Sequence, residues 1–120
     1  MNPEDAARMV AEAMEAGDLD RVVGLYEPNA SLVIEPGTTV TGSAAIREAM
    51  AGFIGLKPKL TSAHNLTVTA DDLALVSTNW SLEGTGPDGN PTTMSGTSME
   101  VIRRQADGSW KVLIDNPFGV

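Results

Sequence analysis

The order of hydrophobic and polar positions divides the chain into an N-terminal half with helical spacing and a C-terminal half with alternating spacing. In the first half, apolar residues recur every three or four positions in three segments. Residues that begin or end helices flank these segments, so we predict three helices, with a short strand over 31–34 between the second and third. The predicted boundaries are Asn2-Pro3 and Gly17 for the first helix, Asp18 and Pro28 for the second, and Gly42-Ser43 at the start of the third.

From Pro58 onward the period changes to two, which is typical of strands with one buried face. Turn residues separate four such segments, near 60–69, 74–82, 92–104 and 110–114. Helices grouped before strands indicate an α+β domain over residues 1–120. We predict a cone-shaped, curved antiparallel sheet with a mixed edge, covered on its concave face by the three helices. A pocket between the two layers is the expected place for a ligand.

Composition and charge indicate which classes of molecule this protein can bind. Apolar residues make up 42% of the chain and charged residues 20%, which indicates a globular core. The formal net charge is −8 and no basic stripe interrupts it, so we expect no nucleic-acid partner. The sequence has neither an apolar run long enough to span a membrane nor a signal-peptide pattern, so we predict a cytoplasmic protein with no membrane partner.

Several kinds of chemistry are excluded by missing residues. Without cysteine the chain has no disulfide, thiolate metal ligand or thiol nucleophile, and its single histidine excludes sites that need two imidazoles. It also lacks a phosphate-binding loop, a dinucleotide fingerprint and a nucleophile elbow. Because no histidine and carboxylate cluster has metal-ligand spacing, we infer neither a metal nor a cofactor.

Glu35 is the first candidate for acid–base chemistry. It ends the apolar run 31–34 and precedes the turn Pro36-Gly37. A buried carboxylate at that place could act as a general base. Alternatively, Glu35 is a rim charge that is solvated or paired with Arg47 or a lysine.

His64 and Asp115 are the other catalytic candidates. His64 lies on the apolar face of its strand, where an imidazole could exchange protons near neutral pH or simply be a satisfied core residue. Alternation predicts that Trp110, Ile114 and Asn116 share one face while Asp115 points to the other, unless a bulge changes the register. One of Asp115 and Asn116 therefore faces inward; in the alternative reading, Asp115 caps a turn with residues 117–119.

Four further residues are candidates for the pocket wall. Tyr26 and Trp80 combine an aromatic surface with one hydrogen-bond donor each, although core packing would also explain them. Met50 and Phe53 share the apolar side of the third helix. We expect Glu100, a second carboxylate in an apolar strand, to face solvent or a dimer partner on the convex side of the sheet.

Four stretches of the sequence together form a recognisable pattern: "AGDLDRVVGLY" (16–26), "NASLVIEPG" (29–37), "TGSAAIREAM" (41–50) and "DGSWKVLIDNPFG" (107–119). In this order they resemble the nuclear transport factor 2-like superfamily, and more narrowly its SnoaL-like and ketosteroid isomerase-like branch of small bacterial proteins. The resemblance implies the cone-shaped fold and dimers formed through the sheet face. It does not choose among the superfamily's activities, which include isomerases, cyclases, hydrolases, dehydratases and non-enzymatic binding modules.

Comparison with the isomerases of this branch also disfavours steroid isomerase activity. Isomerases of this branch place an acidic base in a turn after the first strand, which Glu35-Pro36 matches approximately. They also use a tyrosine on the first helix and a protonated aspartate on a later strand. The matching positions here hold Val10 and the segment 98–100, which contains no aspartate.

Three functions follow as hypotheses. The first is a cofactor-independent isomerase, cyclase or hydrolase that moves protons on a small apolar substrate. The second is a non-catalytic module that binds a small hydrophobic ligand in the same pocket. The third is an association domain that forms a homodimer through the sheet face.

Overall fold

The three predicted helices begin where the sequence indicates. The computed structural model describes residues 1–119. Helix α1 (Pro3–Ala16) begins after Asn2, whose backbone N–H donates to Asp5 Oδ2 at 2.8 Å, and it ends at Gly17, whose φ of 71° is in the left-handed region. Helix α2 (Leu19–Gly24) is capped by Asp18, and α3 (Ser43–Ile54) follows Gly42. The helix predictions are therefore confirmed in number and order.

The end of α2 and the start of the first strand differ from the prediction. Helix α2 ends at Gly24, and β1 (Tyr26–Glu35) begins at Tyr26, so Tyr26 is a strand residue. Pro28, predicted to stop the helix, lies within β1. The register of β1 against β6 shifts between Tyr26 and Ser31, and the pairing of β1 with β2 begins only at Ser31. A proline without an N–H is tolerated in this irregular segment.

The sheet has six strands in the order β2-β1-β6-β5-β4-β3. Strands β3 (Lys59–Ala70), β4 (Leu73–Thr85), β5 (Pro91–Arg104) and β6 (Trp110–Asn116) form an antiparallel meander. Strand β2 (Thr38–Thr41), which was not predicted from the sequence, forms a hairpin with β1. Strand β1 runs parallel to β6. The predicted α+β architecture with a mixed sheet is confirmed.

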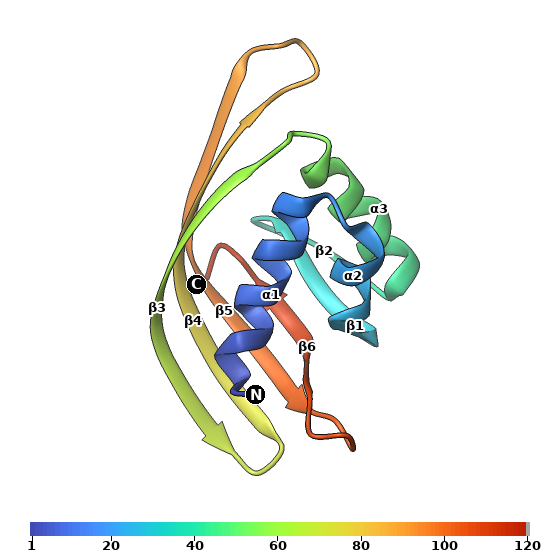
Figure 1. Cartoon of the computed structure of the whole chain (residues 1–120), viewed down its shortest axis with the longest axis vertical. Helices are drawn as coiled ribbons and strands as arrows, with labels where there is room; N and C mark the ends of the chain where they lie inside the picture. Colours follow the sequence, from blue (N-terminus) through green and yellow to red (C-terminus); the bar gives the residue numbers. More distant parts are fainter. Residues whose placement is uncertain (120) are drawn as a thin grey trace.

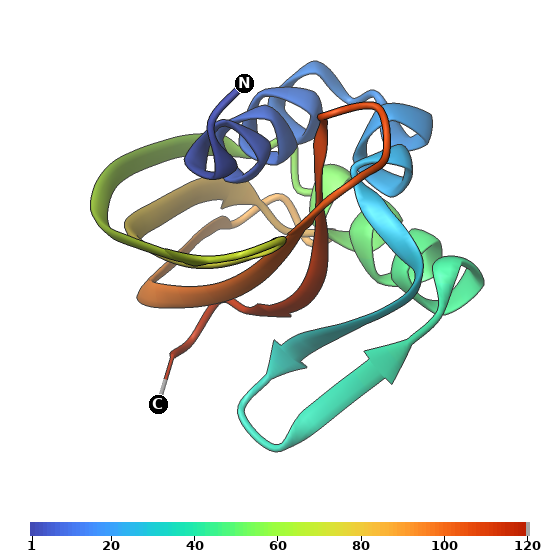
Figure 2. The same ribbon diagram turned by 90° about the horizontal axis from the view of Figure 1, so that it is seen from below.

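The helices lie on the concave face of the sheet. Figure 1 shows α1 crossing this face, with α2 and α3 beside β1 and β2. Figure 2 shows β3, β4 and β5 curving beneath α1. Both ends of α1 are bound to the edge strand β3, because Glu15 Oε1 accepts the backbone N–H of Leu60 at 2.5 Å and Glu4 Oε2 accepts the Thr67 hydroxyl at 3.2 Å.

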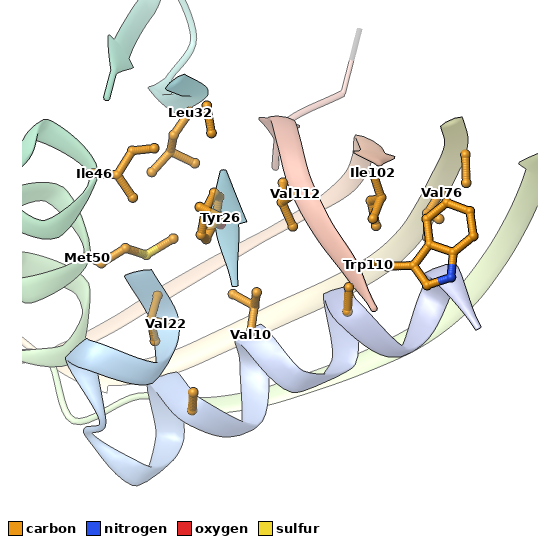
Figure 3. Packing of buried hydrophobic residues seen from close by; sticks show 14 residues of the cluster. Val10, Val22, Tyr26, Leu32, Ile46, Met50, Val76, Ile102, Trp110 and Val112 are labelled. Carbon is orange, nitrogen blue, oxygen red and sulfur yellow. The ribbon is translucent and has the colours of Figure 1, made fainter. Parts of the chain in front are cut away.

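The core fills the space between the helices and the sheet near β1 and β6. Buried apolar side chains from α1, α2 and α3 face those of the strands (Figure 3). Burying side chains of this size stabilises the fold by about 1.5–3 kcal/mol each. The largest fully buried ones are Leu32, Ile46, Ile102, Val22, Val76 and Val112. No helix within residues 1–119 is long and apolar enough to cross a membrane.

Candidate functional site

A cavity of about 380 Å³ lies between α1, α3 and the concave face of the sheet. This volume is within the range of about 300–1,000 Å³ that is usual for small-molecule sites. Its walls are mostly apolar and aromatic, and they come from both helices and from β1, β3, β4, β5 and β6. The apolar lining includes Val10, Met14, Leu32, Met50, Phe53 and Trp80.

Four buried polar side chains also line this cavity. They are Tyr26 at the start of β1, Asp115 in β6, and Ser98 and Glu100 in β5. The Tyr26 hydroxyl donates to Asp115 Oδ2 at 2.5 Å. Glu100 and Asp115 are direct partners on neighbouring strands, so two carboxyl groups share one end of the site. Glu100 Oε2 has no hydrogen-bond partner among residues 1–119.

We call Glu100 and Asp115 the acid pair. Burial changes the pKa values of both acids and of Tyr26. Desolvation, together with the charge of Asp115, raises the pKa of Glu100 to about 8, while the Ser98 hydroxyl acts in the opposite direction. Desolvation also raises the pKa of Asp115 to about 6, and the Tyr26 hydrogen bond limits that rise. Burial and the neighbouring carboxylates raise the pKa of Tyr26 well above its ordinary value. Both acids therefore keep their protons to a higher pH than exposed carboxyl groups do, and Glu100 keeps its proton to a higher pH than Asp115.

A bulge in β6 turns Asp115 toward the cavity. The register between β5 and β6 shifts between Val101 and Ile102, so Val112 and Asp115 are both buried while Ile114 is 46% exposed. Asn116 does not line the cavity. Instead its side chain accepts the N–H of Phe118 at 3.2 Å and donates to the Gly119 carbonyl at 2.6 Å. The turn residue is thus Asn116, and the inward residue is Asp115.

The expectation for Glu100 is wrong. Strand β5 presents Ser98, Glu100 and Ile102 to the helices, and all three are buried. Met99 and Val101 lie on the opposite face and are only partly buried. In this part of β5 the residues on the convex face are more apolar than those on the concave face. Hydrophobic alternation alone therefore assigns the inward face incorrectly.

Glu35 lies outside the cavity. It is exposed at the end of β1, where the pairing with β2 shifts between Val33 and Glu35, and its carboxylate accepts the Thr38 hydroxyl at 3.2 Å. Arg47 pairs with Asp20 at 2.8 Å rather than with Glu35. Of the two interpretations of Glu35, the structure matches the rim charge, because the residue is exposed and does not line the cavity.

The other candidate residues surround the same cavity. Tyr26, Met50, Phe53 and Trp80 line it, and the Trp80 indole N–H donates to the Pro117 carbonyl at 2.6 Å. His64 lines its solvent-exposed side, where Nε2 lies 2.7 Å from the Thr67 hydroxyl. Within residues 1–119 no group of three or more histidine, cysteine or acidic side chains is placed to hold a metal ion.

A protein-family model matches most of the chain. The model of the SnoaL-like domain matches residues 6–113. The chain belongs to the SnoaL-like family. No curated protein matches the sequence of this SnoaL-like domain.

Solved structures share its nuclear transport factor 2-like fold. A ketosteroid isomerase-like protein from Erwinia carotovora atroseptica SCRI1043 is 21% identical, with 94% of this chain and 89% of that chain covered and a TM-score of 0.82. A proposed dehydratase of the NTF2-like family from Streptomyces avermitilis is 20% identical, with 96% and 92% covered and a TM-score of 0.82. A proposed association domain of a calcium/calmodulin-dependent protein kinase type II from Thiobacillus denitrificans is 18% identical, with 99% and 95% covered and a TM-score of 0.79. At these identities the likeness shows the fold alone.

Proposed function

We propose that this SnoaL-like domain is a cofactor-independent enzyme of the isomerase or cyclase type, which moves a proton on a small, apolar, carbonyl-bearing substrate. The observation that carries the proposal is the acid pair in the cavity. Two neighbouring carboxyl groups whose pKa values are about 6 and about 8 provide a base and an acid at the same pH. Asp115 would take a proton from the substrate, and protonated Glu100 would donate to the oxygen that becomes negative.

The environment of the pair supports this assignment. The cavity wall is largely apolar, so it binds the hydrocarbon part of a substrate and strengthens the electrostatic effect of each polar group. Glu100 Oε2 is buried without a partner among the described residues, and a substrate oxygen would satisfy it. Val10 lines the cavity at the position where the steroid isomerases of this branch are expected to have a tyrosine, so steroid isomerase activity remains disfavoured.

A direct test uses small ketones as probes. The protein is incubated in D₂O with a panel such as cyclohexanone, acetophenone and 2-tetralone, and exchange at the carbon next to the carbonyl is followed by proton NMR. We expect catalysed exchange with at least one probe, and a rate lowered by at least about 100-fold in Asp115→Asn. Glu35→Gln, which changes an exposed carboxylate in the same way, is the matched control and should keep the wild-type rate. Probes that bind without exchange would contradict the proposal.

A ligand-binding module is the second candidate function, and the Tyr26–Asp115 hydrogen bond favours it. This contact already occupies one oxygen of the carboxylate that would act as the base. Saturable binding of the probes by calorimetry, unchanged in Asp115→Asn and without exchange, would support this alternative.

We also propose that the domain forms a homodimer through the convex face of the sheet. Register pairing aligns Val68, Leu75, Val101 and Ile114 in one row across four strands. Val68 is 52% exposed and Ile114 is 46% exposed, so this row of aliphatic side chains is only partly covered in one chain. A second copy covering this row would remove it from water. The cytoplasmic location stays a prediction.

A further inference from the structure

A hydrogen-bonded chain of three side chains lies at the exposed side of the cavity. His64 Nε2 is 2.7 Å from Thr67 Oγ1, and Thr67 Oγ1 donates to Glu4 Oε2 over 3.2 Å. His64 and Glu4 both line the cavity. The chain therefore links the edge strand β3 to the first turn of α1 at the entrance of the site.

A bulge in β3 makes this arrangement possible. In a regular strand, residues three apart point to opposite faces. The register of β3 against β4 shifts between His64 and Leu66, so the side chains of His64 and Thr67 meet on one face. Asn65 occupies the bulge, and its side-chain amide exchanges two hydrogen bonds with Asn79 at 3.0 and 2.8 Å. This amide pair holds the bulge in place.

The direction of the hydrogen bonds determines the histidine tautomer. A threonine hydroxyl has one proton, and Thr67 gives it to the Glu4 carboxylate. Thr67 must then accept from His64, so Nε2 carries the hydrogen. In the neutral ring Nδ1 is therefore unprotonated and is a hydrogen-bond acceptor.

We infer that Glu4 and Thr67 are positioning residues that hold His64 as the Nε2–H tautomer, so that Nδ1 can accept a proton from a ligand in the cavity. This inference rests on the proposed function, to which it adds a second proton-transfer group. When Nδ1 takes the proton, the electron pair of the broken C–H or O–H bond stays on the ligand. The imidazolium that forms keeps its Nε2–H donated to Thr67, and the Glu4 carboxylate stabilises its charge.

Other charged groups of α1 also line the cavity. They are Asp5 and Arg8, and the Arg8 guanidinium pairs with Asp5 at 3.4 Å and with Glu12 at 2.7 Å. Thr67 lies in the same cross-strand row as Glu100 and Asp115. Because three strand spacings separate Thr67 from Asp115, the distance along the curved sheet is about 14 Å. The cavity thus carries two separate sets of groups capable of proton transfer, the buried acid pair and the exposed His64.

NMR tests the positioning role without any ligand. His64 is the only histidine of the chain, so a long-range ¹H–¹⁵N spectrum at alkaline pH reports its tautomer without ambiguity. We expect one tautomer, with Nε2 protonated, in the wild type and in Thr67→Ser, which keeps the hydroxyl. Thr67→Val removes the hydroxyl at nearly equal volume and should give a mixture of tautomers. Thr69→Val, on the same exposed strand, is the control and should behave as the wild type. A protonated Nδ1, or a mixture of tautomers, in the wild type would overturn the inference.

The exchange assay tests the proton transfer itself. In the Asp115→Asn background, His64→Gln should lower the remaining exchange of a ketone to the uncatalysed rate, and Thr67→Val should lower it by a smaller factor with KM unchanged. Thr67→Ser should restore most of the loss. If Asp115→Asn abolishes exchange while His64→Gln and Thr67→Val leave it unchanged, the role of His64 is wrong and the proposed function stands. If no ketone is exchanged, the proposed function fails, and the tautomer spectra alone decide whether Glu4 and Thr67 position His64.

Discussion

The Tyr26 hydroxyl donates to Asp115 Oδ2 over 2.5 Å, and this hydrogen bond joins the start of β1 to the end of β6 inside the cavity. It stabilises the ionised form of Asp115 and so opposes the effect of burial on that carboxyl. Glu100, the neighbouring carboxyl, lacks such a donor from Tyr26. One hydrogen bond therefore contributes to the difference in pKa that gives the two acids different roles.

Tyr26→Phe should weaken the folded state in a pH-dependent way. Without the phenolic donor, the ionised Asp115 is buried with one fewer partner, so the pKa of Asp115 should rise. Near pH 8 we expect the free energy of unfolding in urea to fall by about 1–3 kcal/mol relative to the wild type. Near pH 5, where Asp115 is protonated in both proteins, the difference should be smaller. An equal loss at both pH values would contradict this account.

Glu100→Gln should flatten the dependence of stability on pH. In the unfolded chain Glu100 loses its proton near its ordinary value of 4.5, whereas in the folded protein it keeps the proton until about pH 8. The folded state binds more protons across this window, so the wild type should lose stability as the pH rises through it, by roughly a few kcal/mol. Glutamine has the same shape and no charge, so Glu100→Gln should be more stable than the wild type above pH 8.

Thermal unfolding between pH 5 and pH 9 measures this difference. The smaller contribution of Asp115, between its ordinary value of 3.8 and about 6, should remain in the variant. If the unfolding temperatures of the wild type and Glu100→Gln changed with pH in parallel, Glu100 would ionise as an exposed carboxyl does, which would contradict this prediction.

Ile114→Lys should separate the two copies of the proposed dimer. The substitution places a charge in the apolar row on the convex face, where Ile114 is 46% exposed in one chain. We expect light scattering after size exclusion to give a dimeric mass for the wild type at micromolar concentration and a monomeric mass for the variant. Lys111→Glu, which changes a partly buried position in the same strand, is a control that keeps the row intact. A monomeric wild type would exclude the dimer.

The helices could be predicted from the sequence because their signals are local. Asn2, Gly17 and Gly42 mark boundaries through backbone geometry that needs no partner from elsewhere in the chain. In β4, alternation was also sufficient, since Ala74, Val76 and Leu82 are buried as their spacing predicts.

The candidate site could be predicted only in part, because bulges and the convex face break the alternation. In β3 the bulge keeps His64 at the cavity and turns Leu66 to solvent, although strict alternation puts both on one face. In β6 a bulge buries Asp115 and exposes Ile114. Such shifts depend on pairing with another strand. The prediction for Glu100 is wrong because its neighbours Met99 and Val101 are apolar but face outward. Their apolar character belongs to a second apolar surface on the convex face, and not to the core.

The most direct test of the central claim is an NMR titration of the side-chain carboxyl carbons of Glu100 and Asp115, labelled with ¹³C and assigned with Glu100→Gln and Asp115→Asn. The account predicts that the pair titrates with apparent pKa values of about 6 and about 8, the higher of which disappears in Glu100→Gln. Titration of both carboxyls near the ordinary values of aspartate and glutamate would contradict the claim that this cavity holds an acid and a base at neutral pH.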